Sequence, residues 1–308
     1  MILILGSKGQ LGKALCLRLS TENFSFIASD RQSVDICNKQ QVANFISFIK
    51  PKIIINTAAF TNTIRAEKDK DLAKEVNADS IKYICEAANC QKDKPFIIHI
   101  STDYVFNGLL NHTFGYIESD TIDPINYYGK SKAAGEVNLY NNYIRYFIIR
   151  TSWLFGEYGN NFVKKIVKKI VFDQHDAFVV NDQFGSPTSA NTLAKIICLI
   201  IKYIMTNDNT ILDTENKYGI YHFSSMEYMS YYDFACIIRS YLLLNICSEI
   251  KNIYPTETNN HQTIIKRPKN SFLNCKKIKD FLKLKNPDFI WRTECNNILS
   301  NMLKNIHF

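Results

Sequence analysis

The sequence predicts an α/β fold with a Rossmann-type, doubly wound parallel sheet and a smaller C-terminal lobe. Up to about residue 150, short apolar runs of strand length alternate with stretches of helical periodicity. A glycine-rich turn follows the first apolar run directly and opens the first helix. After residue 150 the alternation loosens. We therefore expect a sheet domain at residues 1–150 and a second lobe at residues 151–308, with some segments of the lobe returning to the sheet.

The elements of this fold can be placed in order along the chain. Strands of the sheet are expected at Ile2–Leu5, 24–29, Ile53–Asn56, 96–101 and 146–150. The helices between them are expected at 11–19, 38–49, 72–89 and 129–140. The second half is expected to contain helices at 161–172, 192–205, 231–244 and after Trp291, and strands at Ala177–Val180 and 220–223. Because helices separate the strands of the first half, its sheet should be parallel and covered on both faces.

Composition places the chain among ordinary globular proteins. Of its 308 residues, 46% are hydrophobic and 21% are charged, which is enough for a packed core. The apolar stretches have strand length or are interrupted by lysine, so we expect neither a membrane span nor a membrane partner. The apolar start of the chain enters Gly6 without a basic segment or a cleavage site, which indicates a strand rather than a secretion signal. We therefore expect a cytoplasmic protein.

Charge and cysteine usage exclude two further classes. The net charge of +8 at pH 7 comes mostly from lysines that stand singly, and no recognition module accompanies it, so no nucleic-acid partner is expected. The nine cysteines form no C-x-x-C pair, and the six histidines are dispersed. This pattern favours reduced structural thiols and predicts no metal site.

The turn after the first strand has the pattern Gly-x-x-Gly-x-x-Gly, made by Gly6, Gly9 and Gly12. Glycines permit a tight turn and a close approach of the backbone to a pyrophosphate, and the following helix N-terminus supplies amide donors. An isolated glycine trio can also be a plain strand-to-helix turn. Its place directly after the first strand favours a dinucleotide-binding domain at residues 1–150.

Two neighbouring residues at the end of the second strand bear on the choice of dinucleotide. Asp30 follows Gly12 by about 18 residues, close to the offset of the acid that binds the ribose of NADH. Arg31 comes next, and its guanidinium could instead accept the 2′-phosphate of NADPH. The sequence leaves this choice open. Asp35 has two interpretations, a contact near the adenine and the N-cap of the following helix.

The strongest local signal is the pair Tyr128 and Lys132. Four residues apart on a helix, they share one face. A free phenol titrates near pH ~10, and a nearby ammonium favours the phenolate, so the pair could lower the pKa of the tyrosine for acid/base work. Thr102 follows an apolar strand and should lie at the carboxyl edge of the sheet, where its hydroxyl can face a reacting carbonyl. Chance pairing and strand-end capping are the alternatives, but the combined order of motifs is more specific than any part.

Together these motifs resemble the extended short-chain dehydrogenase/reductases, and within them the dTDP-4-dehydrorhamnose reductase family. The resemblance covers nearly the whole chain. It includes residues 56–61, 76–78, 150–153, 159–162 and 182–188, and Arg267-Pro268 with Ser271 and Leu273.

The resemblance implies specific site residues. Those implied to line NADPH or NADH are Gly9, Gln10, Leu11, Asp30, Asp35, Ile36, Ala59, Phe60, Thr61, Tyr128 and Lys132. It implies that Tyr128 donates the proton and that Thr102, Asp103 and Trp153 contact a dTDP-linked 4-keto sugar. Trp153 could equally be a core residue. Asn161, Phe162 and Arg267 are further substrate-side candidates.

The chain departs from the family pattern at one place. Where the family has an Asp in a V-D-K-A-E stretch, this sequence reads Thr63-Ile64-Arg65-Ala66-Glu67, so the acid is replaced by Ile64. Because that stretch lies near the reaction centre in the family, we consider the hypothesis that Ile64 reshapes the substrate pocket. Magnesium accompanies some family members, but no cluster of candidate ligands for it stands in this sequence. The resemblance also allows a homodimer, while the sequence itself does not fix the oligomeric state.

Three functions follow from these observations. The first is reduction of the C4 ketone of dTDP-4-dehydro-6-deoxy-L-mannose to dTDP-L-rhamnose, the last step of dTDP-rhamnose biosynthesis. The second is reduction of another nucleotide-linked 4-keto sugar, if Ile64 reshapes the pocket. The third is a non-catalytic regulatory subunit, since the methionine adenosyltransferase β subunit resembles the same fold. The complete set of Thr102, Tyr128 and Lys132 does not exclude this third function, but the reductase-like motifs favour an enzyme.

Overall fold

The computed structural model describes residues 1–110, 113–207, 217–245, 250–260, 265–285 and 291–304. Its centre is a six-stranded parallel sheet in the order β10-β5-β4-β3-β1-β2. The strands are β1 (Ile2–Leu5), β2 (Phe26–Ser29), β3 (Ile53–Asn56), β4 (Phe96–Thr102), β5 (Tyr146–Thr151) and β10 (Gly219–Phe223). The sequence-based prediction of a doubly wound parallel sheet is thereby confirmed. Its strand order reverses at β1, which lies between β2 and β3, so a ligand site is expected at the carboxyl ends of β1 and β3.

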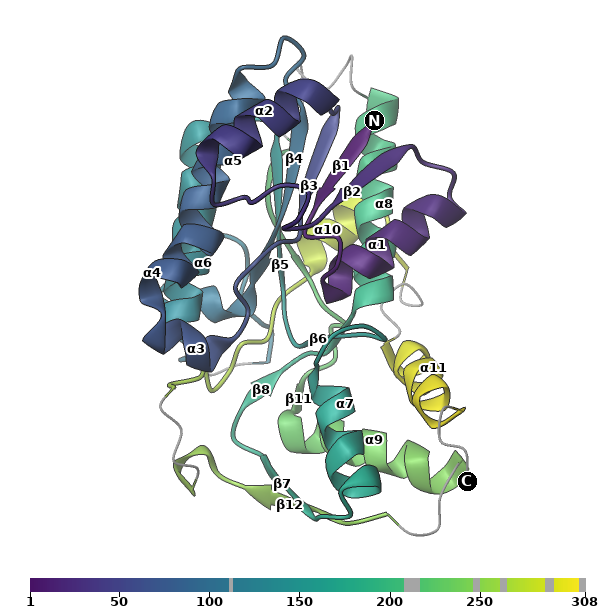
Figure 1. Ribbon diagram of the computed structural model, residues 1–308. Helices are drawn as coiled ribbons and strands as arrows, with labels where there is room; N and C mark the ends of the chain where they lie inside the picture. The colour runs from purple at the N-terminus through teal and green to yellow at the C-terminus, as the bar shows by residue number, and fades with distance from the viewer. Residues whose placement is uncertain (111–112, 208–216, 246–249, 261–264, 286–290, 305–308) are drawn as a thin grey trace.

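Helices cover both faces of the sheet (Figure 1). One layer contains α1 (Gln10–Thr21), α8 (Ala190–Asn207) and α10 (Lys276–Leu282), and the other contains α2 (Lys39–Ile49), α5 (Ser80–Asn89) and α6 (Tyr127–Asn142). Successive side chains of a strand alternate between the layers: Ile2 and Ile4 pack with the α1 side, and Leu3 and Leu5 with the α2 side. All four side chains are at most 2% exposed, so β1 is buried on both faces, which explains its continuous apolar sequence.

The expectation of one uninterrupted helix at 72–89 is wrong. The segment consists of α4 (Lys70–Lys74), a π-helical turn η1 (Glu75–Asp79) and α5. A Cβ placed on Gly135 of α6 would lie 2.1 Å from the carbonyl oxygen of Asn77 in this turn. The two backbones thus touch here, and the wider turn accommodates that approach. A short helix that the sequence did not indicate, α3 (Thr63–Lys68), precedes α4 and begins after its N-cap Asn62.

Segments from beyond residue 150 complete the sheet layers. Strand β10 pairs with β5 at one edge, and α8 packs against α1. Since β10 supplies the sixth strand, the sheet unit extends past residue 150.

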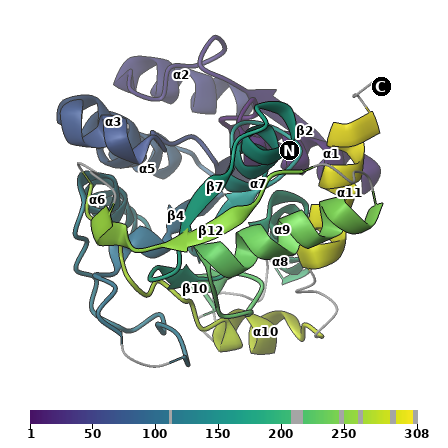
Figure 2. The ribbon, with the colours of Figure 1, turned by 90° about the horizontal axis from the view of Figure 1, so that it is seen from below.

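The rest of the C-terminal half forms the second lobe. Its helices are α7 (Phe162–Val167), which continues in a π-helical turn η3 (Lys168–Phe172), α9 (Tyr231–Asn245) and α11 (Trp291–Lys304). Its short strands pair as β6 (Leu154–Phe155) with β9 (Thr188–Ser189), β7 (Ala177–Val180) with β12 (Ile253–Thr256), and β8 (Phe184–Gly185) with β11 (Met229–Ser230). Figure 2 shows β7 and β12 running side by side next to α9. Phe155, Phe234 and Trp291 lie in its separate core. Two 3-10 turns complete the elements, η2 (Asp103–Val105) and η4 (Thr258–Asn260). Over the described ranges, no helix combines the length and apolar character needed to cross a membrane.

Candidate active site

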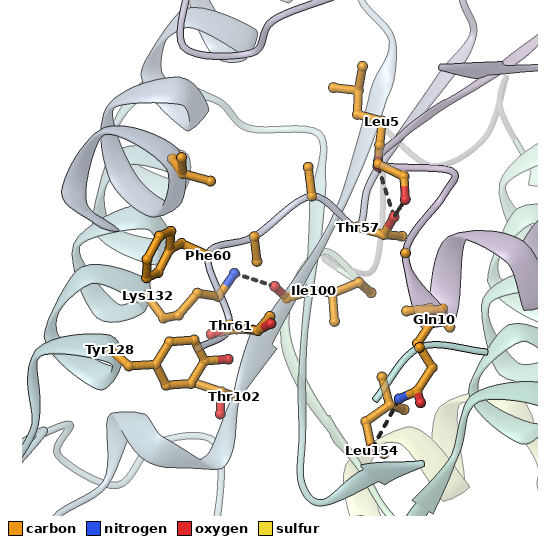
Figure 3. Close-up of a pocket in the computed structure, with 18 of the residues that line it drawn as sticks. Leu5, Gln10, Thr57, Phe60, Thr61, Ile100, Thr102, Tyr128, Lys132 and Leu154 are labelled. Carbon is orange, nitrogen blue, oxygen red and sulfur yellow. Dashed lines mark hydrogen bonds between the residues drawn. The ribbon is translucent and has the colours of Figure 1, made fainter. Parts of the chain in front are cut away.

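A cavity of about 890 Å³ lies at the carboxyl ends of the strands, between the sheet and the second lobe. It begins at the glycine turn after β1, passes the loops after β3 and β4, and reaches Trp153 and Tyr231 of the lobe. Figure 3 shows side chains from β4, α6 and the turn at α1 facing this space. The cavity therefore lies at the switch point of the strand order, where open α/β sheets bind ligands.

The glycine turn has the geometry that a dinucleotide requires. Gly6 adopts φ +84°, and a Cβ there would lie 2.6 Å from the backbone nitrogen of Ala58. Gly9 is the N-cap of α1 and has no side chain over the helix N-terminus. Gly12 differs from the expectation, because it does not line the cavity: a Cβ there would lie 2.3 Å from the Gly6 carbonyl oxygen. Its role is to let α1 pack against the turn.

The other residues expected at the cofactor and substrate do line this cavity. They are Gly6, Gly9, Gln10, Leu11, Asp30, Arg31, Asp35, Ile36, Ala59, Phe60, Thr61, Thr102, Asp103, Tyr128, Lys132 and Trp153.

Asp30 at the end of β2 is held in a network of donors. Its Oδ1 accepts the backbone N–H groups of Gln32 and Ser33 at 2.9 and 3.0 Å. Lys8, from the glycine turn, forms an ion pair with it. The hydrogen bond from Lys8, followed by that from the Ser33 amide, lowers the pKa of Asp30 to about 2. The carboxylate thus has a cation beside it, a partner that its position in the sequence did not indicate.

Asp35 is not the N-cap of α2. That position belongs to Asn38, whose side chain accepts the N–H of Gln41. Asp35 Oδ1 instead accepts the N–H of Cys37 at 3.1 Å, and Arg31 lies 3.6 Å from its other oxygen. Of its two interpretations, the geometry therefore agrees with Asp35 as a cavity residue and not as an N-cap.

The loop after β3 is fixed by Asn77. Asn77 Oδ1 accepts the N–H of Phe60 at 2.8 Å, and Asn77 Nδ2 donates to the Ser131 hydroxyl of α6 at 2.9 Å. The sequence segment around Asn77 carries family resemblance, but its role becomes visible only in the fold. By this bridge, Phe60 and the start of α6 keep a fixed separation across the cavity.

Tyr128 and Thr102 are neighbours at the centre of the site. The side chain of Asn126 accepts the N–H of Gly129 and so begins α6 just before Tyr128. The Tyr128 phenol and the Thr102 side chain lie next to each other and both line the cavity (Figure 3). Burial raises the pKa of Tyr128 above its usual value, while the Thr102 hydroxyl acts in the opposite direction. The phenol is therefore protonated at neutral pH, as a proton donor must be.

Lys132 does not lower the pKa of Tyr128 here, contrary to the expectation from their spacing. Its Nζ donates to the carbonyl oxygen of Ile100 at 2.6 Å and lies 3.2 Å from His99 Nε2. Burial lowers the pKa of Lys132 to about 8, against the raising effect of Glu136. The amine is thus directed towards β4, and burial has the largest effect on the pKa of Tyr128.

Asp103 follows Thr102 and is buried with one oxygen unused. Its Oδ1 accepts the Thr102 hydroxyl at 3.0 Å, and its Oδ2 has no hydrogen-bond partner among the described residues. Burial raises the pKa of Asp103 to about 7. The hydroxyls of Ser101 and Thr151, on the adjacent strands β4 and β5, likewise lack partners among the residues that the structure describes. These three polar groups suit a ligand that brings hydroxyl groups.

The second lobe contributes an aromatic wall. Trp153 stacks on Tyr231 with ring centroids 3.7 Å apart, and a Cβ on Gly185 would lie 2.7 Å from the indole. Tyr104 also lines the cavity; burial raises its pKa, and the charge of the nearby Arg267 opposes that rise. Tyr231, which lines the cavity, had no signal in the sequence that would distinguish it from other aromatic residues of α9.

The remaining candidates lie around this site. Asn161 does not line the cavity but ties the lobe to the glycine turn, because its Nδ2 donates to Gln10 Oε1 at 2.8 Å. Phe162 packs against Tyr231 in the lobe core. Ile64 is 50% exposed on α3, whereas Thr63 and Arg65 line the cavity. The hypothesis that Ile64 reshapes the pocket is therefore not supported by its position.

The groups that line the cavity fit a dinucleotide, whereas a set of metal ligands is not found among the described residues. The free helix N-terminus, the tight glycine backbone and Asp30 with Lys8 match the pyrophosphate and the ribose of such a cofactor. Over the part of the chain that the structure describes, no group of three or more His, Cys, Asp or Glu side chains could hold a metal ion.

This combination of sheet order, glycine turn and Thr–Tyr–Lys site defines an extended short-chain dehydrogenase/reductase. Residues 1–304 match the family model described as the RmlD substrate binding domain, and the chain belongs to that family. The family resemblance deduced from the motifs is thus confirmed.

Individual relatives agree with this assignment. A dTDP-4-dehydrorhamnose reductase of Aggregatibacter actinomycetemcomitans is 36% identical over 96% of this chain and 97% of the relative. The crystal structure of a dTDP-4-dehydrorhamnose reductase from Clostridium acetobutylicum superposes with a TM-score of 0.85 at 31% identity, covering 98% and 99% of the two chains. The enzyme of the same name from Bacillus anthracis, in complex with NADP, gives 0.82 at 34% identity and 99% coverage of both chains. A UDP-glucose 4-epimerase of Thermotoga maritima, 14% identical with a TM-score of 0.78 and covering 99% of both chains, shares the fold.

Proposed function

We propose that this protein reduces the C4 ketone of dTDP-4-dehydro-6-deoxy-L-mannose to dTDP-L-rhamnose with NADPH or NADH. The observation that carries the proposal is that Tyr128 and Thr102 lie next to each other in a cavity that joins the dinucleotide turn to the second lobe. Membership of a family whose relatives include dTDP-4-dehydrorhamnose reductases supports the substrate.

Each residue has a separate task in this reaction. The bound nicotinamide supplies the hydride that reduces the ketone carbon. Tyr128, kept protonated by burial, donates the proton to the ketone oxygen. The Thr102 hydroxyl, which donates its one proton to Asp103 in this structure, turns to donate it to the same oxygen as negative charge develops there. Gly9 and the start of α1 bind the cofactor's phosphates, and Asp30 with Lys8 binds its ribose end. Trp153 and Tyr231 form an apolar wall that restricts water at the sugar.

The substrate side follows from the groups without partners. The Asp103 carboxyl, with its free Oδ2, and the unpartnered hydroxyls of Ser101 and Thr151 can bind sugar hydroxyls. Arg267, whose charge lowers the pKa of the cavity residue Tyr104 against the effect of burial, provides a positive charge for the nucleotide's diphosphate.

The Tyr128→Phe variant tests the proton-donor role. Ketone-dependent oxidation of NADPH, with the keto sugar freshly generated by the upstream enzymes, should fall by at least about a hundredfold, because general acid catalysis is lost. The binding of NADPH should be nearly unchanged. Tyr143→Phe is the control: it removes a phenol at the end of the same helix that bonds only to the Pro95 carbonyl. Near-wild-type turnover in Tyr128→Phe would refute the role.

The same assay separates the alternatives. A preference for another 4-keto sugar in competition would establish the second function. Cofactor binding without turnover of any keto sugar, together with co-purification of a synthetase, would establish a regulatory subunit.

We also propose that residues 1–150 bind the dinucleotide while residues 151–308 mainly bind the substrate, and that the protein works in the cytoplasm as a homodimer. The position of the cavity between sheet and lobe supports the division. Light scattering of the purified protein measures the oligomeric state.

A further inference from the structure

A buried hydrogen-bonded chain lies behind the reaction site. It joins Asn56 at the end of β3, His99 in β4 and Lys132 in α6, each 1% exposed. His99 Nδ1 lies 3.2 Å from Asn56 Nδ2, and His99 Nε2 lies 3.2 Å from Lys132 Nζ. His99 does not line the cavity and had no role in the sequence motifs. Its two ring nitrogens nonetheless link the catalytic lysine to the loop after β3.

The direction of these bonds is fixed at the Asn56 end. Asn56 Oδ1 accepts the backbone N–H of Ala58 at 3.1 Å, so the amide nitrogen is the end that faces His99. An amide NH₂ can only donate, which makes His99 Nδ1 the acceptor and places the proton of a neutral imidazole on Nε2. The imidazole is neutral, because burial, and then the charge of Lys132, lower the pKa of His99 well below its usual range. The Nε2–H of His99 therefore points at Lys132.

The two forms of Lys132 fit this arrangement unequally. A neutral amine has a lone pair that accepts the Nε2–H of His99 while an N–H of the amine still donates to the Ile100 carbonyl. An ammonium has three donors and no acceptor, so two donors face each other. If His99 changes tautomer to relieve that conflict, its Nδ1–H then faces the NH₂ of Asn56, and the mismatch only moves along the chain.

The other charged groups around Lys132 do not remove this inequality. Glu136 lies on the same helix, but its carboxylate is taken by Arg150 of β5 at 2.7 Å, both side chains being buried. Tyr128, on the preceding turn of α6, is neutral at neutral pH, because burial raises its pKa. His99 is thus the partner of Lys132 whose hydrogen bond changes with the lysine's protonation state.

We propose that His99, held by Asn56 as a hydrogen-bond donor, is a positioning residue that stabilises the neutral amine of Lys132 and so makes its ammonium release a proton more readily. This rests on the proposed function of the site, because the pH profile of ketone reduction is one of its readouts. When the ammonium releases a proton to solvent, an Nζ–H bond breaks and the amine left behind accepts the His99 bond. A proton from solvent restores the ammonium.

The cofactor-free protein tests this directly. Lysine labelled with carbon-13 at Cε reports the titration of Lys132, and the loss of one signal in Lys132→Met assigns it. In His99→Gln the amide can turn its oxygen to the ammonium, so the pKa of Lys132 should rise by about one unit. Asn56→Asp keeps the acceptor for Ala58 but accepts from His99 Nδ1, which reverses the tautomer and should shift the titration in the same direction. This second variant decides the matter if His99→Gln does not fold.

The control is the same replacement at His222, an equally buried histidine in β10, two strands away. Its ring contacts Arg150 and the Tyr116 carbonyl, so His222→Gln should leave the Lys132 titration in place. In ketone reduction, the alkaline limb of the kcat profile should move upward with the titration in His99→Gln. An unshifted Lys132 titration in both His99→Gln and Asn56→Asp overturns the proposal. A wild-type protein that turns over no keto sugar contradicts the proposed function instead and leaves the titration result standing.

Discussion

Replacing Asp103 with Asn should remove a pH dependence of stability that originates in the active site. Asp103 is 2% exposed, and the Oδ2 atom of its carboxyl has no hydrogen-bond partner among the described residues. Burial raises the pKa of this carboxyl to about 7, although the nearby hydroxyls of Ser271 and Thr102 oppose the rise. In the unfolded chain the same carboxyl titrates near pH ~3.9.

The magnitude follows from the size of this shift. A rise of about three pKa units, at about 1.4 kcal/mol per unit, corresponds to about 4 kcal/mol. Between the two pKa values the folded state keeps a proton that the unfolded state has released. The contribution of Asp103 to the free energy of unfolding is therefore fully present below about pH 4 and is lost as the pH rises through about 7. Over that range the slope approaches 1.4 kcal/mol per pH unit, for one proton.

Urea unfolding at pH 5, 6, 7 and 8 measures the effect. The stability of Asp103→Asn relative to the wild type should rise by about 2 to 3 kcal/mol from pH 5 to pH 7 and then level off. Ser271→Ala serves as the control, because it keeps the carboxyl and removes a nearby hydroxyl that donates to the Phe184 carbonyl, so the wild-type slope should persist. A stability difference between wild type and Asp103→Asn that is flat from pH 5 to pH 7 would contradict the burial argument.

Two further predictions concern the cofactor turn. Lys8→Ala removes the cation beside Asp30, so the 2′-phosphate of NADPH then meets an uncompensated carboxylate. The Kd for NADPH, measured by fluorescence titration, should therefore rise roughly two- to fivefold more than the Kd for NADH. Lys13→Ala on α1, outside the cavity lining, should change both Kd values equally, and equal changes in Lys8→Ala would refute the role of Lys8. Gly12→Ala should destabilise the protein by about 1–3 kcal/mol or more in thermal unfolding, because its Cβ would lie 2.3 Å from the backbone. In Gly9→Ala the nearest contact is 3.2 Å, so this variant should mainly weaken cofactor binding. A larger loss of stability in Gly9→Ala than in Gly12→Ala would exclude this division of roles.

The sequence predicted the site where each signal is local. The glycine turn, Thr102 and Tyr128 each follow or begin an element whose type the sequence indicates, and parallel strands bring those ends to one edge of the sheet. This is why these residues could be named without knowledge of the packing. Others, such as Phe60, were named from the family resemblance, and the cavity-lining Lys8 and Tyr231 were not named. Gly12 was misplaced because the pattern of three glycines does not distinguish contact with a ligand from contact between two backbones.

What the sequence could not predict depends on contacts between distant segments. Lys8 meets Asp30 only because the turn after β1 lies against the end of β2. The direction of the Lys132 side chain is set by His99 and Ile100, which stand on a neighbouring strand. The break at η1 arises from the backbone of α6, some 60 residues away, and the local pattern at 72–89 is helical throughout. In each case the contact joins residues that are far apart in the sequence, so no local periodicity or motif could predict it.

Helix α6 explains how these distant contacts act together. Within little more than two turns, Tyr128 faces Thr102, Ser131 accepts from Asn77, Lys132 bonds to Ile100, and Glu136 pairs with Arg150 of β5. Removing one partner of such a buried pair leaves an uncompensated charge and costs about 3–5 kcal/mol, so the helix is held firmly against the sheet. The phenol is then placed by bonds that do not themselves touch the ketone. A reduction that depends on the alignment of hydride, proton and carbonyl requires this kind of fixed support.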